Sequence, residues 1–563
     1  MEKLDEHDWQ KGTLKTPTFC EFCSKLIGTI FCVQCQGSCA RTVHSACAAL
    51  LGCQEMPCSS CLSGIAHSMT DKTFGKPTWC NICRQILHGV RRQGQQCTTC
   101  HFVAHRKCLK RADESSLLSC RPTHSPTEEP LAHHWVEGNV RFPKTATMSK
   151  TCMVCNSSIG IPACLVDFHC AWCASLCHST CISKAMSESC DSLGVLGDLI
   201  VSPRMVDEEG RLLPDNSFTK QPLVCFVNSR SGGGQGAKIM HKLQNCLNPI
   251  QVFDLGADGG PERGLSIFRE AYPHGFRVLL CGGDGTINWG LETLRKLDWP
   301  VEERPPIAVL ALGTGNDTSR VLGWGPGYDN EPVRAILEQI LTAEPVQLDR
   351  WQLEIASSEQ PVEQRVFNNY FSIGIDAHIL TGFHERREAS PHLFPSRSVN
   401  KLWYGYESAK ALNKTALDQV RLWIDPEEDE ELDVAEKETR KMASMVDLQK
   451  DGIDGILIVN VPSYAAGTDV WQQDPPQSFS DGIIEVVGIT SVTHMARVVA
   501  GTSYTISLGR GRHIRLELAA TNPVQIDGEP WQQGPATIDI SCIGQATMLR
   551  CIDADEDPAE PLN

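Results

Sequence analysis

Long apolar runs are missing from this sequence. No stretch reaches the roughly 18 apolar residues that a helix needs to cross a bilayer. The first eight residues, which include Glu2, Lys3 and Asp5, form no apolar signal-peptide core. We therefore expect no transmembrane segment, and a cytoplasmic protein that is recruited to membranes only at their surface.

An excess of positive charge is missing too. The 563 residues include 51 Lys and Arg against 68 Asp and Glu, a formal net charge of -17. Because proteins bind nucleic-acid phosphates through a basic face, this balance argues against nucleic acid as the main partner. Acidic residues concentrate at 425–438 and in a tail at 552–563, and we interpret both as solvated segments.

Cysteine is abundant but unevenly distributed. Of 28 cysteines, 23 lie in the first 190 residues, interleaved with histidines at short spacings. This distribution favours zinc over disulfides in a chain without a signal peptide. Repeats that start at His7, His67 and His133 are about sixty residues apart. We expect three zinc-stabilised fingers at 1–62, 63–125 and 126–192, and a turn-rich linker at 193–221.

Finger 2 has the most regular spacing. Its eight candidate ligands make two tetrahedral sites of three cysteines and one histidine, which are structural because no coordination position stays open. In so short a module, the metals supply much of the folding free energy. These ligands are His67, Cys80, Cys83, Cys97, Cys100, His105, Cys108 and Cys120.

The other two fingers are less regular. In finger 3 the opening histidine is either His133 or His134, and the remaining ligands are Cys152, Cys155, Cys170, Cys173, His178, Cys181 and Cys190. Finger 1 opens with the same spacing and then offers two registers, with Cys53, Cys58 and Cys61 competing for the last position. Its candidate ligands are His7, Cys20, Cys23, Cys35, His44 and Cys47.

A short apolar run at 278–281 predicts a buried strand, and the apolar spacing at 287–297 predicts a helix. Between them lie Gly282, Gly283, Asp284, Gly285 and Thr286. Such a loop directs unpaired backbone N–H groups and the positive end of a helix dipole at one point, where a phosphate fits. The alternative is a tight turn that needs positive φ.

The same arrangement occurs twice more. A run at 222–227 is followed by Asn228, Arg230, Ser231, Gly232 and Gly233, and a run at 307–312 is followed by Gly313, Thr314, Gly315 and Asn316. Three such strands predict an α/β domain at 222–348, with the three loops at the carboxyl edge of a mostly parallel sheet, where α/β folds hold ligands. The loops match neither the P-loop nor the Rossmann order.

Carboxylates near these loops are candidates for chemistry. A carboxylate at a phosphate loop is electrostatically unfavourable unless it binds Mg2+ or accepts a proton, and Asp284 is the first candidate, with a helix cap as the alternative. From residue 349 to 551 the pattern changes to strands, which predicts a β-rich accessory domain packed against the carboxyl edge. There Asp527 and Glu529 flank Gly528, where a plain hairpin turn is the alternative.

The three glycine loops, in this order, resemble the catalytic domain of diacylglycerol kinases, whose fold also serves sphingosine and ceramide kinases. The segments at 349–351, 366–377 and 383–387 resemble the accessory region of that family, and finger 2 resembles the phorbol-ester/diacylglycerol (C1) zinc finger. The resemblance implies an ATP-dependent kinase that converts 1,2-diacylglycerol to phosphatidic acid. Another lipid substrate, such as sphingosine or ceramide, and a non-catalytic diacylglycerol-binding scaffold remain alternatives.

The resemblance also implies roles for single residues. In finger 2, His67, Cys97, Cys100 and Cys120 would share one zinc and the other four ligands the second, and finger 3 would open with His133. ATP would lie on the three loops with Mg2+, and either Asp284 or Asp527 would be the general base, with Glu529 part of the same family motif. Trp79, Ile86, Leu87 and Val90 would form an apolar rim that meets diacylglycerol in an anionic membrane. Asp481 resembles a Mg2+-organising turn, although Ser478 and Ile483 lack the flanking ligands.

Overall fold

The computed structural model describes residues 67–552 except 112–119, 125–129, 141–149, 160–166, 216–219, 359–360, 391–392, 394–396, 411–416, 418, 426–444, 447 and 449–451. Five short strands before residue 45 are also described as backbone: β1 (Trp9–Gly12), β2 (Thr18–Phe19), β3 (Leu26–Ile27), β4 (Cys32–Cys35) and β5 (Thr42–His44). The side chains expected as ligands in finger 1 and the acidic tail after 552 lie outside the described residues.

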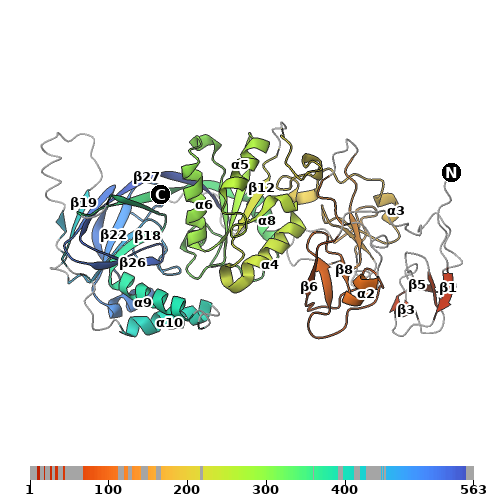
Figure 1. Ribbon diagram of the computed structural model, residues 1–563, viewed down its shortest axis with the longest axis horizontal. Coiled ribbons are helices and arrows are strands. Elements are labelled where there is room, and N and C mark those ends of the chain that lie inside the picture. The colour runs from red at the N-terminus through yellow and green to blue at the C-terminus, as the bar shows by residue number, and fades with distance from the viewer. Residues whose placement is uncertain are drawn as a thin grey trace.

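Fingers 2 and 3 each contain one small antiparallel sheet of three strands, at the right of the molecule in Figure 1. Finger 2 consists of β6 (Met69–Lys72), β7 (Gly94–Cys97), β8 (Val103–Ala104) and α2 (Arg106–Arg111). Finger 3 consists of β9 (Trp135–Glu137), β10 (Phe168–Cys170), β11 (Leu176–Cys177) and α3 (Ile182–Ala185). The 3-10 turns η3 (Gly194–Leu196) and η4 (Pro203–Met205) follow.

The predicted parallel sheet lies at the centre of the molecule. Strands β12 (Leu223–Val227), β14 (Arg277–Gly282) and β15 (Ile307–Ala311) pair in parallel, and β13 (Val252–Asp254) extends the sheet beside β12. Nearly every residue of β12, β14 and β15 is buried, as expected for strands covered on both faces. One face packs on α4 (Ser231–Cys246) and α8 (Val333–Thr342), the other on α5 (Glu262–Ala271) and α6 (Asp284–Lys296).

Two long strands join this sheet to the accessory region. Strand β16 (Glu344–Ala356) crosses residue 348 without interruption and pairs antiparallel with β27 (Ala536–Arg550). Strand β27, near the end of the chain, also pairs in parallel with β15, where Met548 lies opposite Ile307. The central sheet therefore continues through β16, β17 (Glu363–Phe367), β24 (His513–Leu518), β19 (Val420–Asp425) and β20 (Met445–Val446). The sequence pattern did not predict β27.

A second, antiparallel sheet completes the accessory region. Its order is β23 (Ile506–Gly511), β22 (Ile484–Ile489), β21 (Gly455–Val459), β18 (Tyr370–Gly374), β25 (Asn522–Ile526) and β26 (Glu529–Gln533). The region is less purely β than the sequence predicted, because α9 (Ile375–Ala389), α10 (Arg397–Lys410) and α12 (Val492–Val499) belong to it. The pair α9 and α10 lies at the lower left in Figure 1, below the strands of the accessory region.

The stretch after finger 3 packs into the protein interior. Leu193, Leu196 and Leu199 are fully buried, and they share one hydrophobic cluster with finger 3 and with helix α4. The backbone N–H of Leu223, the first residue of strand β12, also donates to the carbonyl of Leu199 at 3.0 Å, which ties this stretch to the central sheet. Among the described residues, no helix is both long enough and apolar enough to cross a membrane.

Candidate functional site

The three glycine loops meet at one edge of the central sheet. Asn228 Nδ2 donates to Thr286 Oγ1 at 3.4 Å, which joins the first loop to the second. The N–H of Leu312 donates to the carbonyl of Gly282 at 2.7 Å, which joins the second loop to the third. A β-carbon on Gly232 would lie 3.1 Å from the carbonyl oxygen of Leu312, so the first and third loops also touch.

Backbone geometry explains why these loops use glycine. Gly232, Gly233 and Gly234 have φ of 61°, 63° and 88°, a left-handed conformation that side chains disfavour, so the regular part of α4 begins only after them. A side chain on Gly282 would overlap Thr286. Ser231 is half-buried in the first loop, and Arg230 is exposed beside it. Helix α6 starts at Asp284, so its positive dipole end faces this edge.

The Asp284 carboxylate points across the second loop to the third. Its Oδ2 accepts from the backbone N–H of Asn316 at 3.0 Å, while Oδ1 is buried and has no hydrogen-bond donor in the described part of the chain. Burial raises the pKa of Asp284, and the N–H donors of the third loop oppose that rise. Gly283 caps helix α6, so Asp284 is not the helix cap that was the alternative.

Asp317 and Thr318, at the start of α7 (Asp317–Val321), tie the third loop to the accessory region. Asp317 Oδ1 accepts from Ser463 Oγ at 2.6 Å and from the N–H of Ala466 at 3.1 Å. Burial raises the pKa of Asp317 to about 6. Thr318 Oγ1 donates to Asn369 Oδ1 at 2.7 Å. The partners of Asp317 could not be inferred from the sequence, because they lie almost 150 residues away.

Asp527 holds a corner of the accessory sheet. Its Oδ2 accepts from the N–H of Asn368 at 3.0 Å, and its Oδ1 accepts from the N–H groups of Asn369 and Tyr370 at 2.9 and 3.0 Å. Both oxygens are therefore engaged by the fold. Burial raises the pKa of Asp527 to about 7, the three N–H donors oppose the rise, and the charge of Asp284 adds to it. The φ of 46° agrees with the tight hairpin turn.

A cleft of about 330 Å³ runs beside Asp527, between α6 and the accessory sheets. Its walls include Gly285 of the second glycine loop and polar side chains along one face of α6. Glu529 lies at the rim with a side chain that is 73% exposed, and its Oε2 is 3.7 Å from His384 Nε2. The lining residues are Gly285, Asn288, Glu292, Arg295, Gln352, Gln364, Arg365, Val366, Ile526, Asp527, Glu529 and Trp531.

The turn at Asp481 is engaged by the fold. Asp481 Oδ1 accepts from the N–H of Ile483 at 3.0 Å, and the N–H of Gly482 donates to Asp349 Oδ2 at 2.7 Å. Nearby, Glu485 is fully buried, and both of its carboxylate oxygens lack a donor in the described part of the chain. Burial and the charge of Asp481 raise the pKa of Glu485 to about 8.

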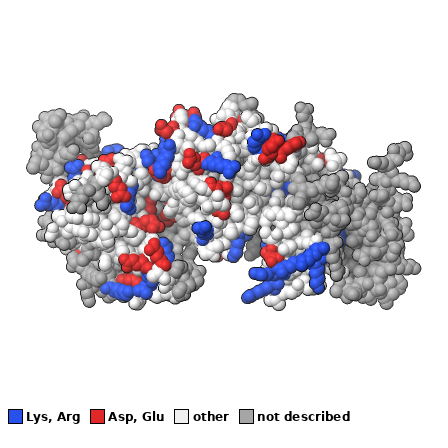
Figure 2. All heavy atoms as spheres, in the orientation of Figure 1, with Lys and Arg blue, Asp and Glu red and all other residues white. Residues whose placement is uncertain are grey.

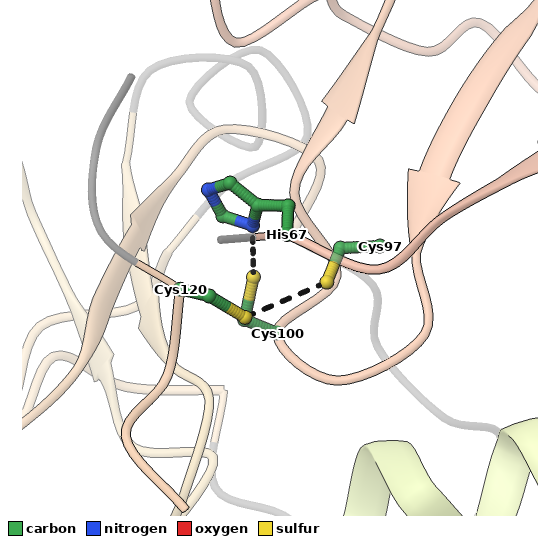
Figure 3. A group of neighbouring side chains, drawn as sticks. All are labelled: His67, Cys97, Cys100 and Cys120. Carbon is green, nitrogen blue, oxygen red and sulfur yellow. Dashed lines mark hydrogen bonds between the residues drawn. The ribbon is translucent and has the colours of Figure 1, made fainter. Parts of the chain in front are cut away.

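Fingers 2 and 3 each bring two sets of metal-ligating side chains together. In every set the four ligand atoms lie within 4.8 Å of one another. Figure 3 shows one set, in which the His67 ring and three cysteine sulfurs point toward a common centre. In finger 3, His133 rather than His134 completes the set. The four sets are His67, Cys97, Cys100, Cys120; Cys80, Cys83, His105, Cys108; His133, Cys170, Cys173, Cys190; and Cys152, Cys155, His178, Cys181.

These sets fit tetrahedral zinc. The four sets together contain twelve cysteines and four histidines, and none of these cysteines forms a disulfide. Three thiolates with one imidazole are a closed structural donor set. The ligand pairing in finger 2 is the interleaved one that the resemblance implied.

The expected apolar rim of finger 2 is only partly exposed. Trp79 and Leu87 are buried, at 9% and 8% exposure, whereas Val90 is 89% exposed and Ile86 lies at the surface. Basic side chains cover the adjoining face, which carries the long blue patch at the lower right of Figure 2. The exposed basic residues of this finger are Lys72, Lys76, Arg91, Arg92, Arg106, Lys107 and Lys110.

Comparison with known families agrees with this geometry. The model of the diacylglycerol kinase catalytic domain matches residues 222–350, and that of the diacylglycerol kinase accessory domain matches 366–530, together more than half of the chain. The chain belongs to the diacylglycerol kinase family. The phorbol esters/diacylglycerol binding domain (C1 domain) matches residues 67–118, which is finger 2.

Similar members of the family come from several animals. The chain is 33% identical to "Probable diacylglycerol kinase 3" of Caenorhabditis elegans, over 86% of this chain and 64% of that protein. It is 32% identical to human diacylglycerol kinase zeta, over 83% of this chain and 54% of that protein. The chain thus spans less than two thirds of either relative. A diacylglycerol kinase structure from Bacillus anthracis str. Sterne aligns with 60% of this chain and 97% of its own, at 16% identity and a TM-score of 0.35.

Proposed function

We propose that this chain is an ATP-dependent lipid kinase that phosphorylates the free hydroxyl of 1,2-diacylglycerol and releases phosphatidic acid and ADP. The observation that carries the proposal is the junction of three glycine loops around Asp284. Backbone N–H groups and the start of α6 supply a phosphate cradle there, and a buried carboxylate oxygen without a donor lies beside it.

In the proposed reaction, the lipid hydroxyl oxygen bonds to the γ-phosphorus of ATP. The bond from that phosphorus to the oxygen bridging the β- and γ-phosphates breaks, and its electron pair leaves with ADP. The hydroxyl proton passes to Asp284 Oδ1. Because burial raises the pKa of this carboxyl, it is a stronger base than an ordinary aspartate. Asp527, whose oxygens are already engaged, acts as a positioning residue that holds the corner at Asn368 and Asn369.

Residues of all three loops would bind ATP. Asn228, Arg230, Ser231, Gly232 and Gly233 would contact it from the first loop, Gly282 to Thr286 from the second, and Gly313 to Asn316 from the third. Mg2+ would be held with the phosphates near Gly315, where a β-carbon would lie 3.3 Å from Asp317 Oδ2 and 3.6 Å from Asp284 Oδ2. When bound, Mg2+ neutralises charge on the transferring phosphoryl group.

We also propose two structural zinc ions in each described finger. Finger 2 would then contact an anionic membrane through a basic face and the exposed Val90, rather than through a deep apolar rim. Each basic residue near such a surface contributes about 1 kcal/mol.

Thin-layer separation of radiolabelled products tests the substrate. The full chain is incubated with labelled ATP, Mg2+ and detergent micelles that contain equal amounts of diacylglycerol, ceramide and sphingosine. Labelled phosphatidic acid as the main product supports the proposal. If the label appears in a sphingolipid product instead, the substrate is ceramide or sphingosine. If no lipid is labelled while zinc and fold are intact, the chain is better explained as a diacylglycerol-binding scaffold.

A further inference from the structure

One arginine from finger 2 lies inside the kinase domain. Arg121 follows Cys120, the last ligand of that finger, yet its side chain is fully buried at the end of helix α4. Its Nη2 donates to the carbonyls of Gln244 at 2.8 Å and Leu247 at 2.7 Å. Its Nη1 donates to the carbonyl of Asn245 at 3.3 Å.

Helix α4 has no left-handed cap residue at this end. The chain leaves the helix at Leu247 in an extended conformation, and the last turn contains no basic residue. Carbonyls at the end of a helix need donors, and the negative end of the helix dipole favours a cation. Arg121 supplies both from another module. Burial lowers the pKa of Arg121 to about 10, which leaves the guanidinium charged at neutral pH.

The same guanidinium also contacts finger 3. Its carbon lies 3.9 Å from the ring centroid of Trp172, and Nη1 donates to the carbonyl of Ala171 at 2.9 Å. Beside it, Asn248 Nδ2 donates to the carbonyl of Thr123, near the end of finger 2, at 2.9 Å. Finger 2, finger 3 and the kinase domain therefore meet at one buried charge.

Fingers 2 and 3 are also joined to each other directly. The Asn139 amide bonds both backbone groups of Trp79, at 2.7 and 2.9 Å, and Arg84 pairs with Glu137 at 2.9 Å. Finger 3 in turn shares its hydrophobic core with α4 and α8. These contacts fix the orientation of finger 2 relative to the opposite end of α4, where Gly232, Gly233 and Gly234 form the first glycine loop.

We infer that Arg121 is a positioning residue for the nucleotide site, which connects finger 2 through helix α4 to the first glycine loop. The regular part of helix α4, which follows Gly234 and ends at Cys246, carries the connection, so that a shift of its end at Arg121 moves the glycine loop at its other end. Finger 2 is then a fixed part of the kinase and not a separate tether. It sets both the orientation of the kinase at the membrane and the geometry of the first glycine loop. The inference rests on the proposed ATP site but not on the identity of the lipid.

Arg121→Met and Arg121→Lys in the full chain test it. The methionine removes every donor, and the lysine keeps the charge but loses the forked geometry. Arg211→Met is the control, because Arg211 is exposed and forms ion pairs with nearby Asp207 and Glu209 at the surface. ATP affinity is measured by calorimetric titration without lipid, thermal unfolding by scanning calorimetry, and amide exchange is followed at 231–246.

We expect weaker ATP binding for Arg121→Met, by roughly 3- to 10-fold, with faster exchange across α4 and a lower melting temperature. Arg121→Lys should fall between it and the wild type, and Arg211→Met should match the wild type. If Arg121→Met is destabilised but binds ATP with unchanged affinity, the inference is overturned, and Arg121 only stabilises the fold. If the methionine variant does not fold, the ATP affinity and melting temperature of Arg121→Lys are compared with those of the wild type in the same way. Failure of the lipid-kinase proposal would show separately, as absent phosphoryl transfer in a wild type that still binds ATP.

Discussion

Gly283 and Gly313 lie back to back where the second and third loops meet. A β-carbon on Gly313 would fall 2.9 Å from the Cα of Gly283 and 2.6 Å from Asn316 Oδ1. Neither neighbour can move freely, because Asn316 is fully buried and its amide donates to the carbonyls of Gly313 and Pro326, both at 2.9 Å. The close approach of two backbones, and not a turn alone, is what requires glycine here.

Gly313→Ala should therefore separate the second and third loops. Since the phosphate cradle is made of their backbone groups, we expect ATP affinity to fall by about 10-fold or more. Gly405→Ala is the control, because a β-carbon there meets nothing within 4 Å. Calorimetric titration with ATP measures both. Wild-type affinity in Gly313→Ala would mean that ATP does not bind at this junction.

Asp284→Asn and Asp527→Asn should separate the two candidate bases. Loss of a positioned proton acceptor costs about 10²- to 10⁴-fold in rate, so we expect kcat to fall by that factor in Asp284→Asn, with the fold unchanged. Asp527→Asn should mainly lower the melting temperature, because one carboxylate oxygen that accepts from the backbone becomes an amide nitrogen. The kinetic and calorimetric effects would be exchanged between the two variants if Asp527 were the base.

Much of the kinase half could be predicted from the sequence, because its strands, loops and helices follow one another closely along the chain. Each strand, glycine loop and helix lies within about 25 residues, and parallel strands place their ends at one edge. The long strand β27 could not be predicted, because its partner β16 lies almost 200 residues earlier and its burial pattern is irregular. The roles of Asp317 and Arg121 likewise depend on partners more than 100 residues away.

The rim of finger 2 shows the same limit. Trp79 and Leu87 look like surface residues of a lipid-binding loop, but Trp79 packs where the neighbouring finger supplies Asn139. Spacing can assign metal ligands within one finger, since those contacts are local. It cannot reveal which faces a second finger covers.

Glu485 should make stability depend on pH. Its pKa is raised to about 8 in the folded chain by burial and by Asp481, whereas an exposed glutamate titrates near 4.3. Between roughly pH 4.3 and pH 8 the unfolded chain loses a proton that the folded chain keeps, so unfolding becomes easier as pH rises, by at most about 1.4 kcal/mol per pH unit. Glu485→Gln should flatten that dependence in melting curves from pH 5 to pH 8. If the melting temperature depends on pH equally in the wild type and in Glu485→Gln, Glu485 is not the source of that dependence.

Val90→Asp should weaken membrane attachment without affecting the kinase chemistry. Val90 is the most exposed large apolar side chain of finger 2, and exposed Arg91 and Arg92 follow it. A carboxylate at this tip opposes both apolar contact and attraction to anionic lipid, so vesicle binding should fall by about 10-fold. Sedimentation with phosphatidylserine vesicles measures the loss, and phosphorylation of a short-chain diacylglycerol in solution should be unchanged.

The start point of a kinase fragment should decide whether it folds. Leu193, Leu196 and Leu199 are fully buried in the cluster that includes α4, and the Gln251 amide donates to the carbonyl of Leu199 at 2.7 Å. A fragment of residues 222–563 lacks these partners and should be insoluble or melt well below the full chain. A fragment of residues 126–563 keeps them together with finger 3, although it loses Arg121, and should remain soluble with a cooperative transition. Equal stability of the two fragments would mean that the buried leucines and finger 3 contribute nothing to the kinase core.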